Sequence, residues 1–207
     1  MGEFTYETET RKWERETYEW DNVWWEHTER TDVPRVLYIG DSISCAARRM
    51  ATAASENTIY FDGLGTSKAL DNPFFPGLIH MFAAQQGQRK AVLFNNGLHG
   101  WHLDDETEYA QHYEQMIRVL LSEFEGTPVV LLLTTHVANP DRDKRVQARN
   151  RVVKALAEKY NLPTIDLYTL TKEGGDLLSG DGVHLKPEGY QLLSACLVEN
   201  VRKYTAE

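Results

Sequence analysis

Three side chains of this sequence have the types that nucleophilic catalysis by a serine requires. The first is Ser42, which follows an apolar run at 35–39 and a Gly-Asp pair and opens an Ala- and Arg-rich stretch that predicts a helix to about Thr52. A hydroxyl at a helix N-terminus lies beside unpaired backbone N–H groups and the positive end of the helix dipole, where an anionic intermediate can be stabilised. The alternative interpretation is that Asp41 and Ser42 only cap the helix.

The other two are His184 and Asp181, which stand three residues apart far downstream. Imidazole is the usual base for a serine hydroxyl because it titrates near neutral pH, and a carboxylate on its second nitrogen fixes the tautomer and stabilises the imidazolium. One loop can supply both groups. Taken alone, such a loop is also typical of a surface turn or of a helix start, which Pro187 marks here. The catalytic interpretation therefore depends on the pairing of the two stretches.

Together, the two stretches resemble the SGNH (GDSL) hydrolase family. Residues 40–43, Gly-Asp-Ser-Ile, look like its first sequence block, and residues 181–185, Asp-Gly-Val-His-Leu, with Pro187 and Gly189 look like its last. The resemblance covers about residues 34–204. It implies an ester hydrolase that uses the serine, histidine and aspartate named above and needs neither a metal nor an organic cofactor.

A third block of the family is similar to residues 94–99, Phe-Asn-Asn-Gly-Leu-His. In the family the asparagine of this block donates to the oxyanion, which implies that role for Asn95. Two positions depart from the family pattern: Leu93 replaces a glycine, and Asn96 stands where many members have aspartate. Some carbohydrate-ester members have a similar Phe-Asn-x-Gly-Leu-His, so the departures indicate a subgroup.

The remaining block supplies the family's oxyanion glycine, on the loop after the second strand. It falls within residues 61–67, where we expect Gly65 to take the role, with Gly63 as the second choice. The resemblance therefore implies an oxyanion hole formed by the backbone N–H groups of Ser42 and Gly65 and by the amide of Asn95.

The rest of the sequence alternates between strands and helices. Strands are predicted at 35–39, 58–61, 90–95, 129–133 and 164–167, and helices at 42–52, 76–86, 104–124, 142–159 and 188–203. This alternation predicts one α/β domain over residues 34–207, a three-layer α/β/α sandwich around a five-stranded parallel sheet. Such a sheet is the flavodoxin-like arrangement of the SGNH hydrolases.

The predicted topology also brings the candidate residues together, because ligands of open parallel sheets collect at the carboxyl ends of the strands. All four sequence blocks follow strands and should meet at one edge. Four further residues near that edge are candidate substrate contacts: Asp41, His99, Trp101 and His136. For His99, Trp101 and His136 the alternative is an ordinary loop role.

Residues 1–33 form an extension that combines many charges with tryptophans and tyrosines: Trp13, Trp20, Trp24 and Trp25, with Tyr6 and Tyr18. Exposed tryptophans would create an apolar patch, so we expect this extension to fold back on the domain as a short strand or helix. Its rings would pack on the sheet edge or in a homodimer contact. The functional alternative is that Trp24 or Trp25 borders the pocket.

Composition narrows the class of protein. A chain of 207 residues with 42% hydrophobic residues is long enough for one domain with a core, and its net charge of −9 argues against nucleic acid or an anionic membrane as partner. Cys45 and Cys196 are expected to be buried thiols. No apolar stretch has the length of a membrane span and no signal core occurs, so we expect a cytoplasmic protein, although a removed leader would leave the same sequence.

The function expected from these features is hydrolysis, through a serine, of a short acyl ester such as the acetate of a carbohydrate or another polar alcohol. The alternatives are a lysophospholipase or thioesterase of the same fold and a non-catalytic ligand-binding module. A further alternative is a metal-dependent or phosphate-ester hydrolase that would use Asp41, Asp62, His99 and His184.

Overall fold

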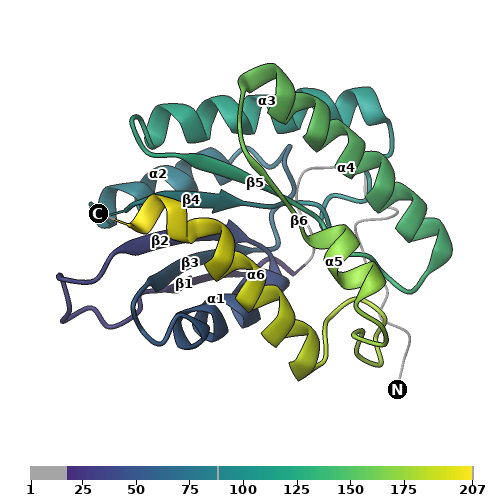
Figure 1. Ribbon diagram of the computed structural model, residues 1–207. Coiled ribbons are helices and arrows are strands. Elements are labelled where there is room, and N and C mark those ends of the chain that lie inside the picture. Colours follow the sequence, from purple (N-terminus) through teal and green to yellow (C-terminus); the bar gives the residue numbers. More distant parts are fainter. Residues whose placement is uncertain (1–17, 88, 207) are drawn as a thin grey trace.

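The computed structural model describes residues 18–87 and 89–206, which form helices packed on both faces of a central sheet (Figure 1). The strands are β1 (Asp21–Trp24), β2 (Arg35–Gly40), β3 (Tyr60–Thr66), β4 (Ala91–Phe94), β5 (Val129–Leu133) and β6 (Thr164–Asp166). The helices are α1 (Ser42–Ala54), α2 (Phe75–Gln85), α3 (Glu106–Glu123), α4 (Pro140–Tyr160), α5 (Leu167–Glu173) and α6 (Pro187–Thr205).

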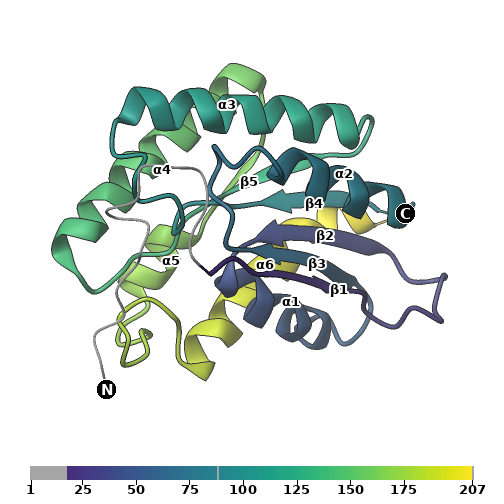
Figure 2. The ribbon, with the colours of Figure 1, turned by 180° about the vertical axis from the view of Figure 1, so that it is seen from behind.

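The sheet has six strands in the order β1-β3-β2-β4-β5-β6. Strands β2 to β6 are parallel, and β1 is added antiparallel to β3 at the edge, which Figure 2 shows from behind. The parallel part has the order 2-1-3-4-5 of flavodoxin-like folds. The predicted three-layer α/β/α fold is confirmed, with one edge strand more than expected.

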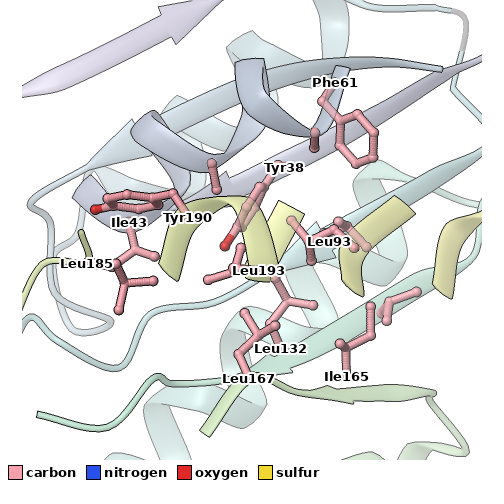
Figure 3. Packing of buried hydrophobic residues seen from close by; sticks show 14 of the residues in the cluster. Tyr38, Ile43, Phe61, Leu93, Leu132, Ile165, Leu167, Leu185, Tyr190 and Leu193 are labelled. Carbon is pink, nitrogen blue, oxygen red and sulfur yellow. The ribbon is translucent and has the colours of Figure 1, made fainter. Parts of the chain in front are cut away.

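The central strands are buried on both faces, and alternate residues face different helices. Tyr38 of β2 belongs to a cluster with residues of α1 and α6, whereas its neighbour Ile39 belongs to a cluster with residues of α2 and α3. Figure 3 shows the first cluster, in which Leu93 and Leu132 of neighbouring strands pack beneath Leu193 of α6. The apolar run at 129–133 is entirely buried, as predicted.

The second parallel strand differs from the prediction. It was expected at 58–61 with a loop behind it, but β3 extends from Tyr60 to Thr66 and therefore contains Gly63 and Gly65. The two glycines suggest a turn, yet their missing side chains serve packing: a β-carbon at Gly63 would overlap the Arg48 side chain of α1, and one at Gly65 would overlap Cys45 Sγ. The expectation that this segment is a loop is wrong.

The N-terminal extension is described only from Tyr18 onward, so Tyr6 and Trp13 lie outside the described residues. Its part at 21–24 is the edge strand β1. Helix α5 was not predicted, because seven residues are too few for a clear helical period. No helix in the described ranges is both long and apolar enough to cross a membrane.

Candidate active site

Ser42 is the first residue of α1, directly after the strand β2 and the N-cap residue Asp41. The carboxylate of Asp41 accepts a hydrogen bond of 2.9 Å from the Ile43 N–H. A β-carbon at Gly40 would lie 2.9 Å from Ser44 Cβ, so the abrupt change from strand to helix requires glycine there. The hydroxyl of Ser42 is thus held at the carboxyl edge of the sheet.

A chain of hydrogen bonds joins Ser42 to His184 and Asp181. His184 Nε2 lies 2.8 Å from Ser42 Oγ, and His184 Nδ1 lies 2.6 Å from Asp181 Oδ2. An ionised carboxylate only accepts, so Nδ1 carries the ring proton and the neutral Nε2 accepts from the serine hydroxyl. This is the tautomer in which imidazole can remove the serine proton.

Asp181 has a second set of donors on its other oxygen. Oδ1 accepts from the backbone N–H groups of Val183 and His184, each at 2.9 Å, and from Ser179 Oγ at 2.8 Å. Partial burial alone would raise the pKa of Asp181, but the hydrogen bonds from the His184 ring, Val183 and Ser179 outweigh it and hold this pKa well below its usual range. The carboxylate therefore stays ionised.

The loop that carries this pair is fixed to the end of β5. Ala138 N–H donates to Gly182 O at 2.8 Å, and Gly182 has φ +72° with Ala138 Cβ only 2.8 Å from where its β-carbon would be. A side chain at this position would be both strained and obstructed. On the other side, Ser179 N–H donates to His184 O at 2.7 Å. The His184 ring is thereby positioned from both ends of the loop.

Asn95 follows β4, at the same edge of the sheet. Its amide nitrogen donates to Leu132 O at 2.8 Å and to Thr134 Oγ1 at 3.0 Å, so both amide hydrogens are directed to β5 and the residues after it. The neighbouring Asn96 was not among the candidates. Its amide donates to Lys68 O at 2.8 Å and ties the segment after β4 to the one after β3.

Gly65 lies inside β3, opposite Gly40 of β2 and Asn22 of β1. Gly63 is likewise paired on both sides. Neither glycine is on a loop behind the strand, which is where the sequence had led us to expect the oxyanion donor.

Asp41 directly precedes Ser42, and the His99 ring lies near enough to Asp41 to act on its charge. Asp41 is 2% exposed, and its Oδ2 has no hydrogen-bond partner within the part of the chain that the structure describes. Burial raises the pKa of Asp41, and the charges of the His99 and His184 rings act in the opposite direction. Both imidazoles thus act electrostatically on the residue that precedes the serine.

Two other predicted contacts are placed differently. Trp101 is 1% exposed and lies beneath the guanidinium groups of Arg145 and Arg149, so its ring is part of the core, which favours the structural alternative over the expected substrate contact. His136 is 9% exposed after β5, and its ring lies edge-on to Tyr168. Burial lowers the pKa of His136.

The tryptophan beside the site is Trp20, which the sequence had not singled out. The two that it had singled out are engaged elsewhere: Trp24 donates to Glu26 at 3.0 Å, and the Trp25 ring stacks on Phe82 at 4.8 Å. Trp20 instead lies with its ring centroid 6.2 Å from that of His99. Nothing in the local sequence distinguishes these three tryptophans.

The metal-site alternative finds no geometric support within the described ranges, where no three His, Cys, Asp or Glu side chains are arranged to hold an ion. Asp62, one of the four ligands considered, is fully buried and pairs with Arg35 at 2.9 Å.

Comparison with solved structures supports the fold assignment. A member of the lipolytic protein G-D-S-L family from Veillonella parvula DSM 2008 is similar at 20% identity and a TM-score of 0.67, over 81% of this chain and 97% of that one. Axe2, an acetylxylan esterase from Geobacillus stearothermophilus, is similar at 15% identity and a TM-score of 0.62, over 84% and 95%. A carbohydrate esterase family 3 protein from Talaromyces cellulolyticus is similar at 13% identity and a TM-score of 0.63, over 83% and 97%.

At these identities the structures share the fold with this chain, and the sequence itself carries the family assignment. No curated protein matches the chain. A sequence model of the GDSL-like Lipase/Acylhydrolase family matches residues 38–192, which include both the serine after β2 and the Asp-x-x-His loop before α6. The chain belongs to the GDSL-like lipase/acylhydrolase family.

Proposed function

We propose that the protein is a serine esterase that releases a short acyl group, acetate, from a carbohydrate or another polar alcohol. The observation that carries this proposal is the chain of hydrogen bonds from Asp181 through His184 to Ser42, with distances of 2.6 Å and 2.8 Å. A serine, a neutral imidazole in the required tautomer and an ionised carboxylate together meet the needs of acyl transfer.

In the proposed first step, Ser42 Oγ attacks the ester carbonyl while its proton passes to His184 Nε2. The negative charge of Asp181 stabilises the imidazolium that forms. When the tetrahedral intermediate collapses, the bond to the alcohol oxygen breaks and His184 Nε2 returns the proton to that oxygen. The products of this step are the free alcohol and an ester on Ser42.

The oxyanion of this intermediate needs donors next to Ser42. The backbone N–H of Ser42, the first of α1, has no acceptor within the helix and is our leading candidate. We also propose Asn95 and Gly65, as the family resemblance implies. Asn95 would have to release one of its two present acceptors, Leu132 O or Thr134 Oγ1, to donate to the oxyanion.

The second step repeats this chemistry with water. His184 removes a proton from the water that attacks the acyl carbon, and the proton then goes to Ser42 Oγ as the ester bond breaks. The acid is released and the hydroxyl is restored, so the cycle needs no other reactant.

Two considerations support a short acyl group on a polar alcohol. The residue that precedes the serine is an aspartate, and the His99 ring is near enough to act on it electrostatically. Structures of the same fold include an acetylxylan esterase and a carbohydrate esterase family 3 protein, although their identity to this chain is only 15% and 13%.

The proposal is tested by hydrolysis of p-nitrophenyl acetate, butyrate and octanoate with the wild type, Ser42→Ala and the control Ser122→Ala, which changes an exposed serine of α3. We expect the acetate to react fastest, Ser42→Ala to lose all but residual activity and Ser122→Ala to behave as the wild type. A serine-directed phosphonate should add to the wild type and to Ser122→Ala but not to Ser42→Ala, as measured by intact mass.

Each other outcome contradicts a stated part of the proposal. Full activity in Ser42→Ala would exclude Ser42 as the nucleophile. A preference for octanoate would exclude the short acyl group and favour a lysophospholipase, and loss of activity in EDTA would favour the metal-dependent alternative. If the wild type hydrolyses neither acetylated xylan nor the aryl esters, the result would contradict the esterase and favour the non-catalytic ligand-binding module.

A further inference from the structure

Trp20 is held beside the site by its own backbone and by its two neighbours. Its N–H donates to Ser67 Oγ at 2.9 Å, and its carbonyl accepts from the Ser67 N–H at 3.1 Å. The adjacent Asp21 accepts from Lys68 Nζ at 2.8 Å, and Glu19 lies 3.6 Å from the same ammonium group. These bonds join the segment before β1 to the end of β3 and fix where the indole projects.

The indole lies beside Gly65 of β3, the residue paired with Gly40 just before the Asp41-Ser42 step. A β-carbon at Gly65 would overlap Cys45 Sγ and would lie 3.4 Å from both Trp20 Cζ3 and Asp41 O, so the ring edge is packed close to the start of α1. On its other side, the Trp20 ring meets His99 edge-on, with an interplanar angle of 75°. The indole is only half-buried, and the two rings stand at the sheet edge from which Ser42 also projects.

His184 approaches the serine from a different part of the sheet. Its loop is fixed to the end of β5 through the hydrogen bond between Ala138 and Gly182, whereas Trp20 comes from the edge formed by β1 and β3. Strand β2, which leads to Ser42, lies between β3 on one side and β4 and β5 on the other. His184 and Trp20 therefore lie on opposite sides of β2.

The direction of proton transfer then orients the substrate. His184 Nε2 must reach the oxygen of the departing alcohol, so the alcohol lies on the His184 side. The oxyanion and the acyl chain take the other two directions from the acyl carbon, and one of these directions leads to the edge where Trp20 and His99 stand. We infer that Trp20 is the end wall of the acyl pocket and restricts the substrate to short acyl groups. This inference rests on the esterase function proposed above and assigns its acyl-chain selectivity to one residue.

The test is the acyl-chain selectivity of Trp20→Ala and Trp20→Phe on p-nitrophenyl acetate, butyrate and hexanoate. Each methylene group that a pocket accepts or refuses changes kcat/KM about 10-fold or more. We expect the ratio of kcat/KM for hexanoate to that for acetate to rise at least about 10-fold in Trp20→Ala, with a smaller rise in Trp20→Phe. The main-chain bonds to Ser67 do not involve the indole, and the thermal unfolding temperature of each variant checks that the fold is kept.

The matched control is Trp24→Ala, which removes a tryptophan from the same segment. The Trp24 indole bonds Glu26 and lies 4.6 Å from the Arg49 guanidinium, so its removal should leave the selectivity ratio unchanged. An equal rise in Trp24→Ala would indicate a general loosening of β1 and contradict the inference.

The failure of this inference is distinguishable from failure of the esterase proposal. An active wild type with Ser42-dependent hydrolysis and an unchanged selectivity ratio in both Trp20 variants would overturn the acyl wall and leave the esterase in place. Absence of Ser42-dependent hydrolysis in the wild type would overturn both. If Trp20→Ala does not fold, the ratio in Trp20→Phe decides alone, since phenylalanine preserves a ring on the same backbone.

Discussion

The two oxygens of Asp181 serve different partners, and this division explains how the site is ordered before a substrate binds. Among the residues that the structure describes, Oδ2 is hydrogen-bonded only to the imidazole of His184, while Oδ1 accepts from two backbone N–H groups and from Ser179. A carboxylate bound in this way cannot turn to other partners without losing several hydrogen bonds. The imidazole therefore keeps one orientation and one tautomer.

Replacement of Asp181 by asparagine should reduce catalysis far more than it changes the shape of the loop. The amide can offer a donor to Nδ1, which favours the tautomer with the proton on Nε2, and kcat/KM for p-nitrophenyl acetate should fall by about 10³- to 10⁴-fold. The control is Asp176→Asn, an exposed aspartate whose carboxylate pairs with Lys186 at 2.6 Å. A decrease below tenfold in Asp181→Asn would contradict the proposed role.

The lowered pKa of Asp181 also predicts how stability depends on pH. A carboxylate whose pKa is lower in the folded than in the unfolded state stabilises the fold fully above the unfolded pKa of about 3.9, and that contribution is lost as the pH falls through the lower folded pKa. Urea unfolding of the wild type and of Asp181→Asn at pH 7, 5 and 3 measures it. The advantage of the wild type should be constant between pH 7 and 5 and smaller at pH 3; an advantage that grows toward pH 3 would show the opposite sign.

At the scale of elements, one side chain of α4 organises the segment between β4 and α3. Arg149 is 4% exposed and donates to four carbonyl oxygens: Gly97 at 3.0 Å, His99 at 2.8 Å, Gly100 at 2.6 Å and Leu103 at 3.2 Å. Its guanidinium lies between the rings of Trp101 and Tyr109, at 4.7 Å and 4.6 Å. Burial lowers the pKa of Arg149 to about 10, so it remains charged at neutral pH. The backbone conformation of the segment that carries His99 therefore depends on a residue about fifty positions away.

Arg149→Met should destabilise the protein, because it leaves buried carbonyl oxygens without donors. The free energy of unfolding should fall by at least about 2 kcal/mol, since each unsatisfied buried group costs about 1–3 kcal/mol. Arg151→Met is the control: this neighbouring arginine is exposed, its ion pair with Glu106 measures 3.4 Å, and its loss should cost less than about 1 kcal/mol. Equal effects of the two substitutions in urea unfolding would refute the role of Arg149.

For the molecule as a whole, stability comes from two apolar clusters that lie on opposite faces of the sheet. Leu131 and Leu132 are consecutive residues of β5, both fully buried, but Leu132 belongs to the cluster under α6 and Leu131 to the cluster under α2 and α3. Because β2, β3, β4 and β5 each contribute to both clusters, neither face can lose its packing while the site at the sheet edge stays intact.

Leu131→Ala and Leu132→Ala should therefore be destabilising to a similar degree, each by about 2–5 kcal/mol in urea unfolding. The control is Leu192→Ala on α6, whose side chain is 38% exposed and whose loss should cost less than about 1 kcal/mol. Activity and tryptophan fluorescence should be lost at the same urea concentration. If the substitution on one face leaves the free energy of unfolding nearly unchanged, the two clusters contribute unequally to stability.

Much of the fold and of the candidate site could be predicted from local sequence patterns. Apolar runs bounded by Gly and Pro identified the five parallel strands, helical periods identified five of the helices, and the order of these elements determined the fold class. Ser42, Asp181 and His184 were named from residue type and spacing, and the structure brings their side chains within hydrogen-bond distance. Their catalytic roles and those of Gly65 and Asn95 stay predictions.

Contacts between distant segments could not be predicted in this way. The sequence itself determined which stretches are strands and helices and which side chains could do serine chemistry, because periodicity, caps and motifs are local. It did not reveal that Gly65 belongs to a strand, that Trp101 is buried beneath Arg149, or that Trp20 and not Trp24 lies beside Gly65 and His99. Those outcomes depend on which side chains occupy the same space after the sheet has formed, and that is known only once every neighbour is in place.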